Sequence, residues 1–271
     1  MTDVIPQEDG SDAVESESKD RLFVTALARG LMVLRAFKPG DTWLGNQELA
    51  QRTGLPKSTI SRLTYTLLQL GYLTQDPDNG RYRPGVAVLG LGYAALSTLD
   101  IRQVALPLMR ELSLDTGLSV TLAARSGHNM IYIEACRAAA RVSVKHDVGS
   151  SVPLATTAIG RAWLAGLSYP ERQATLQQLA EHYGARWPAM LKPVNAAMDY
   201  YSEHGFTISL GEYEPDIYAI GAPLASSQPG QSHLSLNCSG PAFRLNQAIL
   251  ENEIAPKLLD LIDKLGGKPR V

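Results

Sequence analysis

Apolar residues recur at three- and four-residue steps along much of the chain, and this spacing is typical of amphipathic helices. Within residues 24–37, the apolar positions Val24, Leu27, Leu31 and Leu34 form one stripe, which we expect to face a hydrophobic core. A Pro-Gly pair follows and ends this first predicted helix. The pattern therefore predicts a helix that is buried along a single face.

Two further helices are predicted directly after the first. A short one covers residues 47–52, with Asn46 as its expected N-cap. After a turn centred on Gly54, a third helix is expected over residues 56–70, because proline suits the first helical position and Gly71 can end the helix. Its buried stripe is expected to consist of Ile60, Leu63, Leu67 and Leu70.

Two short runs of β-forming residues, 72–74 and 81–83, flank the pair Asn79-Gly80. An Asn-Gly pair between such runs predicts a β-hairpin. Helix, helix, tight glycine turn, helix and hairpin within about 65 residues is the order of a winged helix-turn-helix. Residues 21–85 are therefore predicted to form a DNA-binding domain of that kind.

The outward side of the third predicted helix is rich in hydroxyl groups and carries two cations. A helix in the major groove needs such a surface, because hydroxyls and cations reach phosphates and an arginine can pair with a guanine edge. A small helical bundle with a solvated polar face is the alternative, and the order of the elements favours DNA binding. The candidate DNA-binding residues are Asn46, Gln47, Lys57, Ser58, Thr59, Ser61, Arg62, Tyr65, Arg81 and Arg83, the last two in the predicted wing.

Residues 86–99 are rich in leucine and small residues, and we expect a helix that is apolar on more than one side. Such a helix between two domains is often a dimer contact or an interdomain strut. A protein that binds a symmetric operator must be a dimer to contact both half-sites. We therefore expect this segment to be a linker helix in a homodimer or homotetramer.

Helical and β-type patterns then alternate through residues 100–271. Strands in two groups with helices packed on them predict an α+β sensor-like domain. The expected helices cover residues 101–116, 157–166, 170–183, 192–203 and 243–265. The expected strands cover residues 119–125, 130–135, 142–145, 207–210, 218–224 and 232–237, the last two joined by a turn at residues 226–231.

The composition is that of a globular protein, since 45% of the 271 residues are hydrophobic and 19% are charged. The longest nearly apolar stretch, residues 217–225, is about half of the ~20 residues that a membrane span needs. No membrane partner is therefore expected. Only two cysteines and a polar first segment favour a cytoplasmic protein without a secretory signal.

The net charge of -2 hides an uneven distribution along the chain. Residues 1–20 carry seven acids and one base, and we expect them to form a disordered acidic leader. Residues 21–90 carry nine bases and four acids. A compact basic segment attracts polyanions, although a solvated basic face would have the same charge.

The sequence offers little catalytic or metal-binding chemistry. No phosphate-binding glycine loop, nucleophile elbow or Cys-x-x-Cys pair occurs, so no cofactor and no catalytic residue is expected. The five histidines lack the spacing of a zinc site. A non-local metal site built from Cys136, His146 and Cys238 is a minor alternative to two buried, inert cysteines.

Two segments have the polar atoms of a ligand pocket. Residues 152–162 place hydroxyls and free backbone N–H groups at a helix start, where a carboxylate could bind. Residues 236–241 place polar atoms where a strand is expected to meet a Gly-Pro turn. Ordinary capping and turn chemistry explains both segments equally well.

Several short stretches, in a fixed order, resemble the IclR-type bacterial transcriptional regulators over residues 22–265. In the first domain these are residues 28–34, 48–59 and 70–73, and in the second they are residues 160–162, 205–206 and 239–241. Each stretch is unspecific by itself, whereas together they are highly specific. The resemblance implies a winged helix-turn-helix, a linker helix and a GAF-like α+β effector-binding domain, assembled as a dimer or tetramer on a palindromic or repeated operator.

The resemblance also implies an effector, usually a small organic acid such as glyoxylate, pyruvate or an aromatic acid. This chain has Ala158-Ile159 where the glyoxylate- and pyruvate-binding members have Gly-Ala, and it has Ser209 and Ala219 in place of an acid and a cysteine. These departures imply a different acid, larger or aromatic. The implied effector-binding residues are Ala158, Ile159, Ser209, Ala219, Asn237 and Ser239, with Glu212 and Arg161 as further candidates and a structural role for Arg161 as the alternative.

The leading hypothesis is a sequence-specific transcriptional regulator that an organic acid controls, governing a catabolic operon without catalysis of its own. Its partners would be a double-stranded DNA operator, the acid and further copies of the chain. The alternatives are an enzyme with an accessory DNA-binding domain and a ligand-independent DNA-binding protein. Turnover of a bound acid would favour the first alternative. A thermal stability that organic acids do not change would favour the second.

Overall fold

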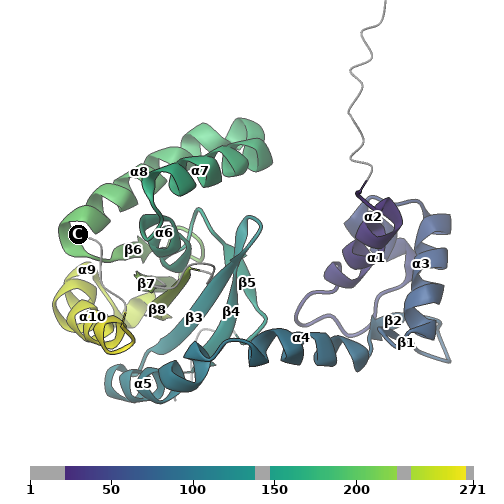
Figure 1. The fold of residues 1–271 in the computed structure, drawn as a ribbon, viewed down its shortest axis with the longest axis horizontal. Coiled ribbons are helices and arrows are strands. Elements are labelled where there is room, and N and C mark those ends of the chain that lie inside the picture. Colours follow the sequence, from purple (N-terminus) through teal and green to yellow (C-terminus); the bar gives the residue numbers. More distant parts are fainter. Residues whose placement is uncertain (1–21, 138–146, 225–232, 267–271) are drawn as a thin grey trace, which may run out of the picture. The chain divides into compact units, whose positions relative to one another are not determined.

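The structure is a computed structural model that describes residues 22–137, 147–224 and 233–266 (Figure 1). The chain divides into two compact units, Met1–Tyr93 and Ala94–Val271. The leader expected over residues 1–20, the strand expected over residues 142–145 and the turn expected at residues 226–231 lie outside the described residues.

The first unit has the predicted order of three helices and a hairpin. Strands β1 and β2 pair antiparallel, with Thr74 opposite Arg83. An isolated bridge between Leu44 and Tyr82 extends this small sheet by one segment. The elements are α1 (Thr25–Arg35), α2 (Asn46–Thr53), α3 (Lys57–Gln69), β1 (Leu73–Gln75) and β2 (Tyr82–Pro84), followed by α4 (Ala87–Ser97).

The core of the first unit differs from the predicted stripes. In α1 the fully buried residue is Val33, which is not part of the predicted stripe. Two residues of that stripe are largely exposed, Val24 at 61% and Leu27 at 63%. Leu31 is exposed and Leu34 only half-buried, because α1 packs on α2 and α3 through a narrow strip. The predicted burial of this stripe was therefore wrong, and it forms an apolar surface instead.

Helix α3 keeps most of its predicted buried stripe. Ile60 and Leu67 are buried, but Leu70 is exposed at the end of the helix. Thr64 takes the vacant core position, because its hydroxyl donates to the carbonyl oxygen of Ile60 at 3.0 Å and so needs no water. Gly71, with φ +75, ends the helix as expected.

The N-cap of α2 is Gly45 and not Asn46, which is the first residue of the helix. The side chain of Glu48 accepts a hydrogen bond from the Gly45 backbone N–H at 2.7 Å. This carboxylate satisfies a donor that would otherwise be free at the helix start. Gly54 has φ +71, a conformation that glycine tolerates, and it makes the turn between α2 and α3.

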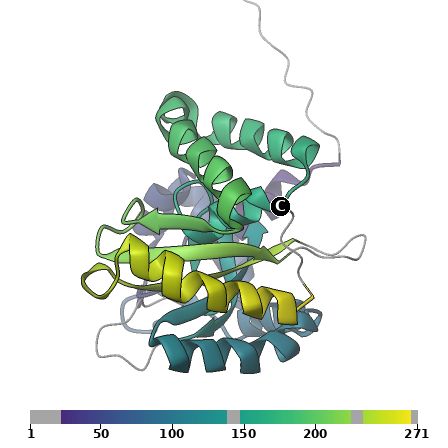
Figure 2. The same ribbon diagram turned by 90° about the vertical axis from the view of Figure 1, so that its left-hand side faces the viewer.

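The second unit is one six-stranded antiparallel sheet with helices on both faces. The strand order is β5-β4-β3-β8-β7-β6. Helices α5 and α10 lie side by side on one face, and α6, α7 and α8 lie on the other (Figure 2). The helices are α5 (Ile101–Thr116), α6 (Ala158–Ala165), α7 (Tyr169–Tyr183), α8 (Trp187–His204), α9 (Gln247–Ile249) and α10 (Ala255–Lys264), and the strands are β3 (Ser119–Ser126), β4 (Asn129–Cys136), β5 (Ser151–Pro153), β6 (Thr207–Leu210), β7 (Ile217–Leu224) and β8 (Leu234–Pro241).

Three boundaries of the second unit differ from the sequence prediction. Strand β8 continues to Pro241 because β3 and β7 pair with it on both sides, so residues 238–241 are strand and not turn. Helix α8 starts five residues before the predicted position, with Pro188 in its first turn. The last helix starts at Gln247, where the Asn246 side chain accepts from the N–H of Ile249, and a π-helical turn, Leu250–Ile254, joins α9 to α10.

Two hydrophobic clusters hold the second unit together, one on each face of the sheet. Residues such as Met109, Leu236 and Leu258 fill the layer under α5 and α10. Ile159 and Leu179 belong to the layer under α6, α7 and α8. Among the described residues, no helix is long and apolar enough to cross a bilayer.

Candidate nucleic-acid interface and ligand cavity

Helix α3 turns its polar side to solvent. Lys57, Ser58, Ser61, Arg62 and Tyr65 are exposed, and Thr59, the sixth candidate on this helix, is half-buried. Ile60, Thr64 and Leu67 occupy the opposite side and hold the helix against the core. The predicted recognition surface is therefore a free surface of the first unit and not an internal one.

Asn46 lies against α3 and connects two helices. Its Nδ2 donates to the hydroxyl of Ser61 at 3.1 Å, and that hydroxyl donates to the carbonyl oxygen of Lys57 at 3.1 Å. These bonds fix the start of α2 beside the first turns of α3. Gln47, the neighbouring candidate, is exposed.

The two wing arginines differ in their surroundings. Arg81 pairs with Glu48 of α2, with 2.5 Å between Nη2 and Oε2, so it braces the wing against the helices. The backbone N–H of Gly45 and the guanidinium of Arg81 together lower the pKa of Glu48 below its ordinary value. Arg83 is exposed, and its guanidinium lies 4.7 Å from the ring centre of Trp43. Arg83 therefore lies against an aromatic ring, whereas Arg81, with 42% of its side chain exposed, is held in an ion pair.

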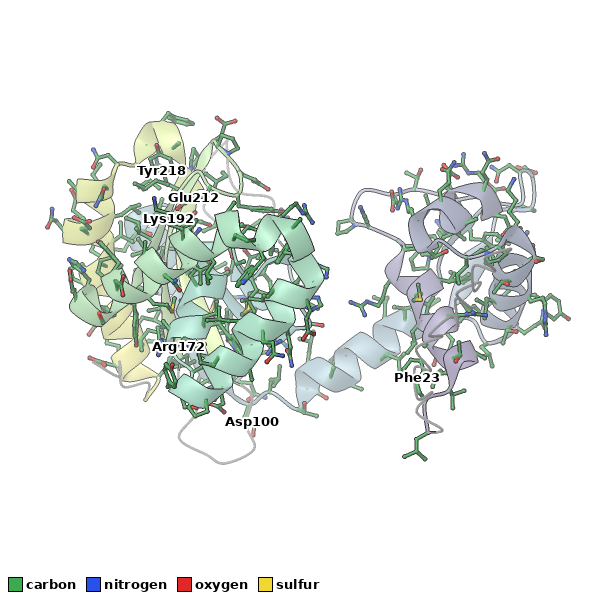
Figure 3. The ribbon with its side chains drawn as sticks, turned by 90° about the horizontal axis from the view of Figure 1, so that it is seen from above. Phe23, Asp100, Arg172, Lys192, Glu212 and Tyr218 are labelled. Atoms are coloured by element: carbon green, nitrogen blue, oxygen red, sulfur yellow. The ribbon has the colours of Figure 1, made fainter. Side chains whose placement is uncertain are left out.

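An apolar groove of about 860 Å³ runs along α3, and four of the candidate DNA-binding residues line it: Thr59, Ser61, Arg62 and Tyr65. Its floor comes from α1 and α3, including Leu27, Leu31 and Leu63, and Leu91 of α4 contributes to its wall. Phe23, just before α1, is also exposed, at 63% (Figure 3). Contiguous apolar surface of this kind marks an interaction site in soluble proteins.

Strand pairing in the second unit gathers most of the implied effector residues on one face of the sheet. Ala219 of β7 lies opposite both Ser209 of β6 and Ser239 of β8. Asn237 lies two residues before Ser239, and successive side chains alternate between faces, so both point to the same side. On that side, Asn237 is opposite Thr121 of β3.

These residues line a small cavity that closes against the start of α6. The cavity volume is about 40 Å³, far below the 300–1,000 Å³ typical of a ligand pocket. Ile159 is fully buried in the hydrophobic core and is not among the residues that line the cavity. The lining residues are Tyr132, Val152, Thr157, Ala158, Ser209, Tyr213, Glu214, Ile217, Ala219, Asn237 and Ser239.

Asn237 is the most constrained polar group of the cavity. It is 4% exposed, and its Oδ1 accepts a hydrogen bond from the hydroxyl of Thr121. Thr121 also hydrogen-bonds to Tyr132, whose buried hydroxyl has a raised pKa and stays protonated. The Nδ2 of Asn237 has no partner among the residues that the structure describes. Thr121 therefore fixes the side-chain amide of Asn237 through its oxygen.

Helix α6 begins at the edge of this cavity. The Thr157 hydroxyl caps it by accepting from the N–H of Gly160 at 3.2 Å. The backbone of α6 lies close to β7, since a Cβ atom at Gly221 would come within 2.8 Å of the Ala158 carbonyl oxygen. Glycine at position 221 thus permits the approach that brings the helix start to the ligand cavity.

Arg161 and Glu212, the further candidates, pair with each other and do not line the cavity. Arg161 is buried on α6, and its Nη1 lies 2.9 Å from Oε1 of Glu212 in the β6–β7 loop. Burial would raise the pKa of Glu212, but hydrogen bonds from Ser209 and Arg161 outweigh burial and lower it. The carboxylate therefore stays ionised beside its buried partner.

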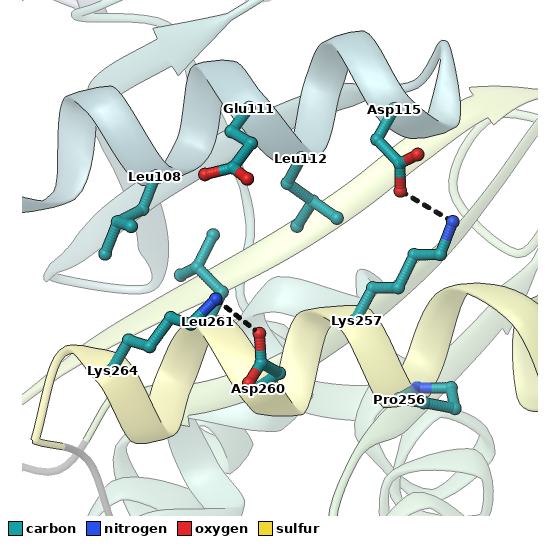
Figure 4. Close-up of a pocket in the computed structure, with 9 residues that line it drawn as sticks. All are labelled: Leu108, Glu111, Leu112, Asp115, Pro256, Lys257, Asp260, Leu261 and Lys264. Carbon is teal, nitrogen blue, oxygen red and sulfur yellow. Dashed lines mark hydrogen bonds and ion pairs between the residues drawn. The ribbon is translucent and has the colours of Figure 1, made fainter.

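Another hollow of the second unit has a different character. It has a volume of about 330 Å³ and lies between α5 and α10 (Figure 4). Lys257 pairs with Asp115 at 2.6 Å, and Lys264 pairs with Asp260 at 2.8 Å. None of the residues implied by the sequence lines this hollow.

The cysteines and histidines do not assemble into a metal site within residues 22–137, 147–224 and 233–266. Cys136 and Cys238 are both buried and free, and burial raises the pKa of the Cys238 thiol to about 12. They lie on the two strands that flank β3, each opposite Val120. His146, the third member of the hypothetical site, is outside the described residues.

The fold and the two surfaces define the class of protein: a DNA-binding regulator with a winged helix-turn-helix and an α+β ligand domain. The comparisons with known proteins agree. Residues 26–77 match the IclR helix-turn-helix domain, and residues 93–265 match the bacterial transcriptional regulator IclR C-terminal domain. The chain therefore belongs to the IclR family of transcriptional regulators.

Relatives of known sequence and structure extend over almost the whole chain. The HTH-type transcriptional regulator TsaQ1/TsaQ2 of Comamonas testosteroni is 31% identical over 91% of this chain and 89% of its own length. An IclR family regulator from Brucella abortus is 41% identical, with a TM-score of 0.81 over 93% of this chain and 94% of its own. An IclR homologue from Microbacterium hydrocarbonoxydans, complexed with 4-hydroxybenzoate, is 21% identical, with a TM-score of 0.69 over 89% and 97% of the two chains.

Several residues of these surfaces escaped the sequence analysis. Thr121 and Tyr132 sit within ordinary strand patterns, and only strand register brings them to Asn237. Tyr213 reaches the cavity from a loop that carries no motif. Trp43 could have been noticed in the sequence, because an aromatic ring near the predicted wing can stack with a wing arginine, as it does with Arg83.

Proposed function

We propose that this protein binds operator DNA through α3 and the wing, and that a small organic acid bound in the cavity of the second unit controls this binding. The observation that carries the proposal is the solvent-facing polar side of α3. Its relatives are named as transcriptional regulators, which supports regulation without catalysis. The gene targets would be those of a catabolic operon.

The DNA half of the proposal rests on the polar side chains of α3 and the wing that are exposed to solvent. Arg62 is exposed in the middle of α3, and an arginine there can make two hydrogen bonds to a guanine edge. Lys57 and Ser58 at the helix start suit phosphate oxygens. Arg83 on the wing would meet the neighbouring groove or its phosphates. Arg81, which is paired with Glu48, would position the wing instead of contacting DNA.

The effector half follows from the polar groups of the cavity. No lysine or arginine lines it among the described residues, so a carboxylate would bind through neutral donors. The suitable donors are the Nδ2 of Asn237, the hydroxyl of Ser239 and the free backbone N–H of Ala158 at the start of α6. Tyr132 and Tyr213 supply aromatic walls, which favour an aromatic acid.

Dimerisation follows from the apolar surface of the first unit. Two recognition helices must be held in symmetry-related positions to read two half-sites. The exposed apolar residues on α1, just before it and on α4 would provide a surface for a second copy, as a dimer or as half of a tetramer. They include Val24, Leu27, Leu31, Leu89, Leu91 and Tyr93.

The test is operator binding by the full chain with and without acids. An operator is selected from random duplexes, and its affinity is measured by fluorescence anisotropy while 4-hydroxybenzoate and other aromatic and aliphatic acids are added. We expect at least one acid to shift the operator affinity and to raise the melting temperature saturably. Asn237→Ala should lose the shift and keep acid-free DNA binding.

Three results would contradict parts of the proposal. Failure to select any operator would overturn the DNA half. An operator affinity that no acid changes would favour a ligand-independent DNA-binding protein. Chemical conversion of the bound acid, followed by mass spectrometry, would favour an enzyme with an accessory DNA-binding domain.

A further inference from the structure

The loop between β6 and β7 is held by a buried charge. Arg161 is 2% exposed, and its Nε donates to the carbonyl oxygen of Ala155 at 3.0 Å. That bond fixes the guanidinium on α6, with Nη1 directed to Glu212 at 2.9 Å. A buried guanidinium is costly without its counterion, so the loop carboxylate is strongly favoured at this position.

Glu212 uses its second oxygen to organise the loop itself. Its Oε2 accepts from the backbone N–H of Leu210 at 2.7 Å and from the hydroxyl of Ser209. Gly211, with φ +91, allows the chain to turn tightly here, because a Cβ atom would come within 3.0 Å of the Pro215 carbonyl oxygen. One carboxylate thus connects α6, the end of β6 and the turn.

The next two residues of the same loop form part of the cavity wall. Tyr213 and Glu214 line the cavity, together with Ser209, which is already bound to Glu212. Tyr213 is 41% exposed, so it faces the cavity on one side and solvent on the other. The remaining wall comes from strands of the sheet and from the start of α6, which are paired or packed within the core.

We propose that the Arg161–Glu212 pair is a latch that holds residues 210–216 over the effector cavity, with Arg161 as its positioning residue. The inference rests on the proposed effector site. A cavity of about 40 Å³ holds only a few water molecules, so an aromatic acid enters when one wall moves. The backbone N–H of Ala242 donates to the carbonyl oxygen of Asp216 at 2.8 Å and holds the β7 end of this loop, whereas the ion pair ties the turn after β6 to α6. Arg161 acts on the ligand only through this pair.

The latch can be tested without any effector. Ala219→Cys places a thiol in the cavity wall, and its alkylation by iodoacetamide reports opening of the loop. Glu212→Gln keeps the shape of the side chain but removes its charge. We expect it to speed alkylation of Cys at position 219 about tenfold, the effect of losing one charge-assisted hydrogen bond. Asp115→Asn, which breaks the ion pair between α5 and α10, should leave the rate unchanged.

Two internal controls separate a latch from general loosening. Cys238 is fully buried in β8, and its alkylation in the same samples, measured by peptide mass spectrometry, should stay slow. Arg161→Met and Glu212→Gln together should speed alkylation no more than the faster single variant, because both remove the same interaction. Hydrogen exchange should increase for the backbone N–H groups of residues 210–214 and 216, and not for those of residues 234–240 in β8.

The inference is overturned by an unchanged alkylation rate in Glu212→Gln, by equal acceleration at Cys238, or by single-variant effects that multiply in the double variant. These outcomes are independent of the proposed function. Should no acid bind the protein, the effector proposal fails while the alkylation rates still decide whether the pair holds the loop closed.

Discussion

Thr121 offers a sharp test of how the cavity is built. It is 3% exposed, and its hydroxyl donates to Oδ1 of Asn237. Thr121→Val keeps the shape of the side chain and removes this donor. Because Asn237 is itself buried, its carbonyl oxygen would then lack a partner, which costs about 1–3 kcal/mol. We expect the free energy of unfolding of the second unit to fall by that amount.

The measurement is urea denaturation followed by circular dichroism, with Thr98→Val as the matched control. Thr98 is exposed, and its hydroxyl donates to a carbonyl oxygen within its own helical turn, so its loss should cost less than about 0.5 kcal/mol. Thr121→Val should also weaken acid binding, because the amide of Asn237 loses its fixed orientation. Unfolding free energies that are equal in the two variants, with acid affinity unchanged, would refute the reasoning.

Three further predictions concern the first unit. Arg62→Ala should weaken operator binding by about 1–3 kcal/mol and relax base preference at one position. The control Lys38→Ala should leave operator affinity and base preference unchanged. Fluorescence anisotropy with a set of mutated operators checks both variants. Leu91→Glu should raise the dissociation constant of the proposed dimer at least about tenfold in sedimentation velocity, since a charge would be buried in the interface proposed on α1 and α4. The side-chain hydrogen bond from Arg52 lowers the pKa of Asp41 to about 2. The contribution of this pair to stability is therefore present above the ordinary pKa of 3.8 and is lost as pH falls through about 2. Carbon NMR of the Asp41 carboxyl measures the titration, and a midpoint near 4 would contradict the pairing.

Local patterns predicted the fold wherever one residue type decides the local geometry. Gly54 and Gly71 take positive φ values and follow the ends of α2 and α3 where the sequence suggested. Helix α5 covers the predicted residues 101–116, because its apolar period is regular and Gly117 ends it. These features depend on backbone sterics and on the spacing of apolar residues, and both can be inferred from the sequence.

Patterns failed where a tertiary contact decides. The apolar stripe of α1 looked like a core stripe, but burial depends on what packs there, and an exposed apolar stripe has the same period. Asn46 is a good N-cap by type, yet Glu48 already satisfies the Gly45 N–H. Ile159 matched a ligand position by family resemblance, whereas helical geometry turns its side chain into the core.

The candidate site was only partly accessible for the same reason. Alternation along β8 puts Asn237 and Ser239 on one face, which the sequence can indicate. Their partners Thr121 and Ala219 depend on register between strands that are distant in the sequence. The Arg161–Glu212 pair joins residues of a helix and a loop, and no local pattern announces it.

The central claim is that one acid-binding cavity and one DNA-binding face are coupled. Thermodynamic linkage requires the coupling to be reciprocal: the factor by which the acid changes operator affinity must equal the factor by which the operator changes acid affinity. Isothermal titration of the full chain with the acid, in the absence and in the presence of saturating operator, measures this directly. We expect the same factor in both directions, and an acid affinity that is identical with and without operator would show that the cavity and the DNA-binding face are not coupled.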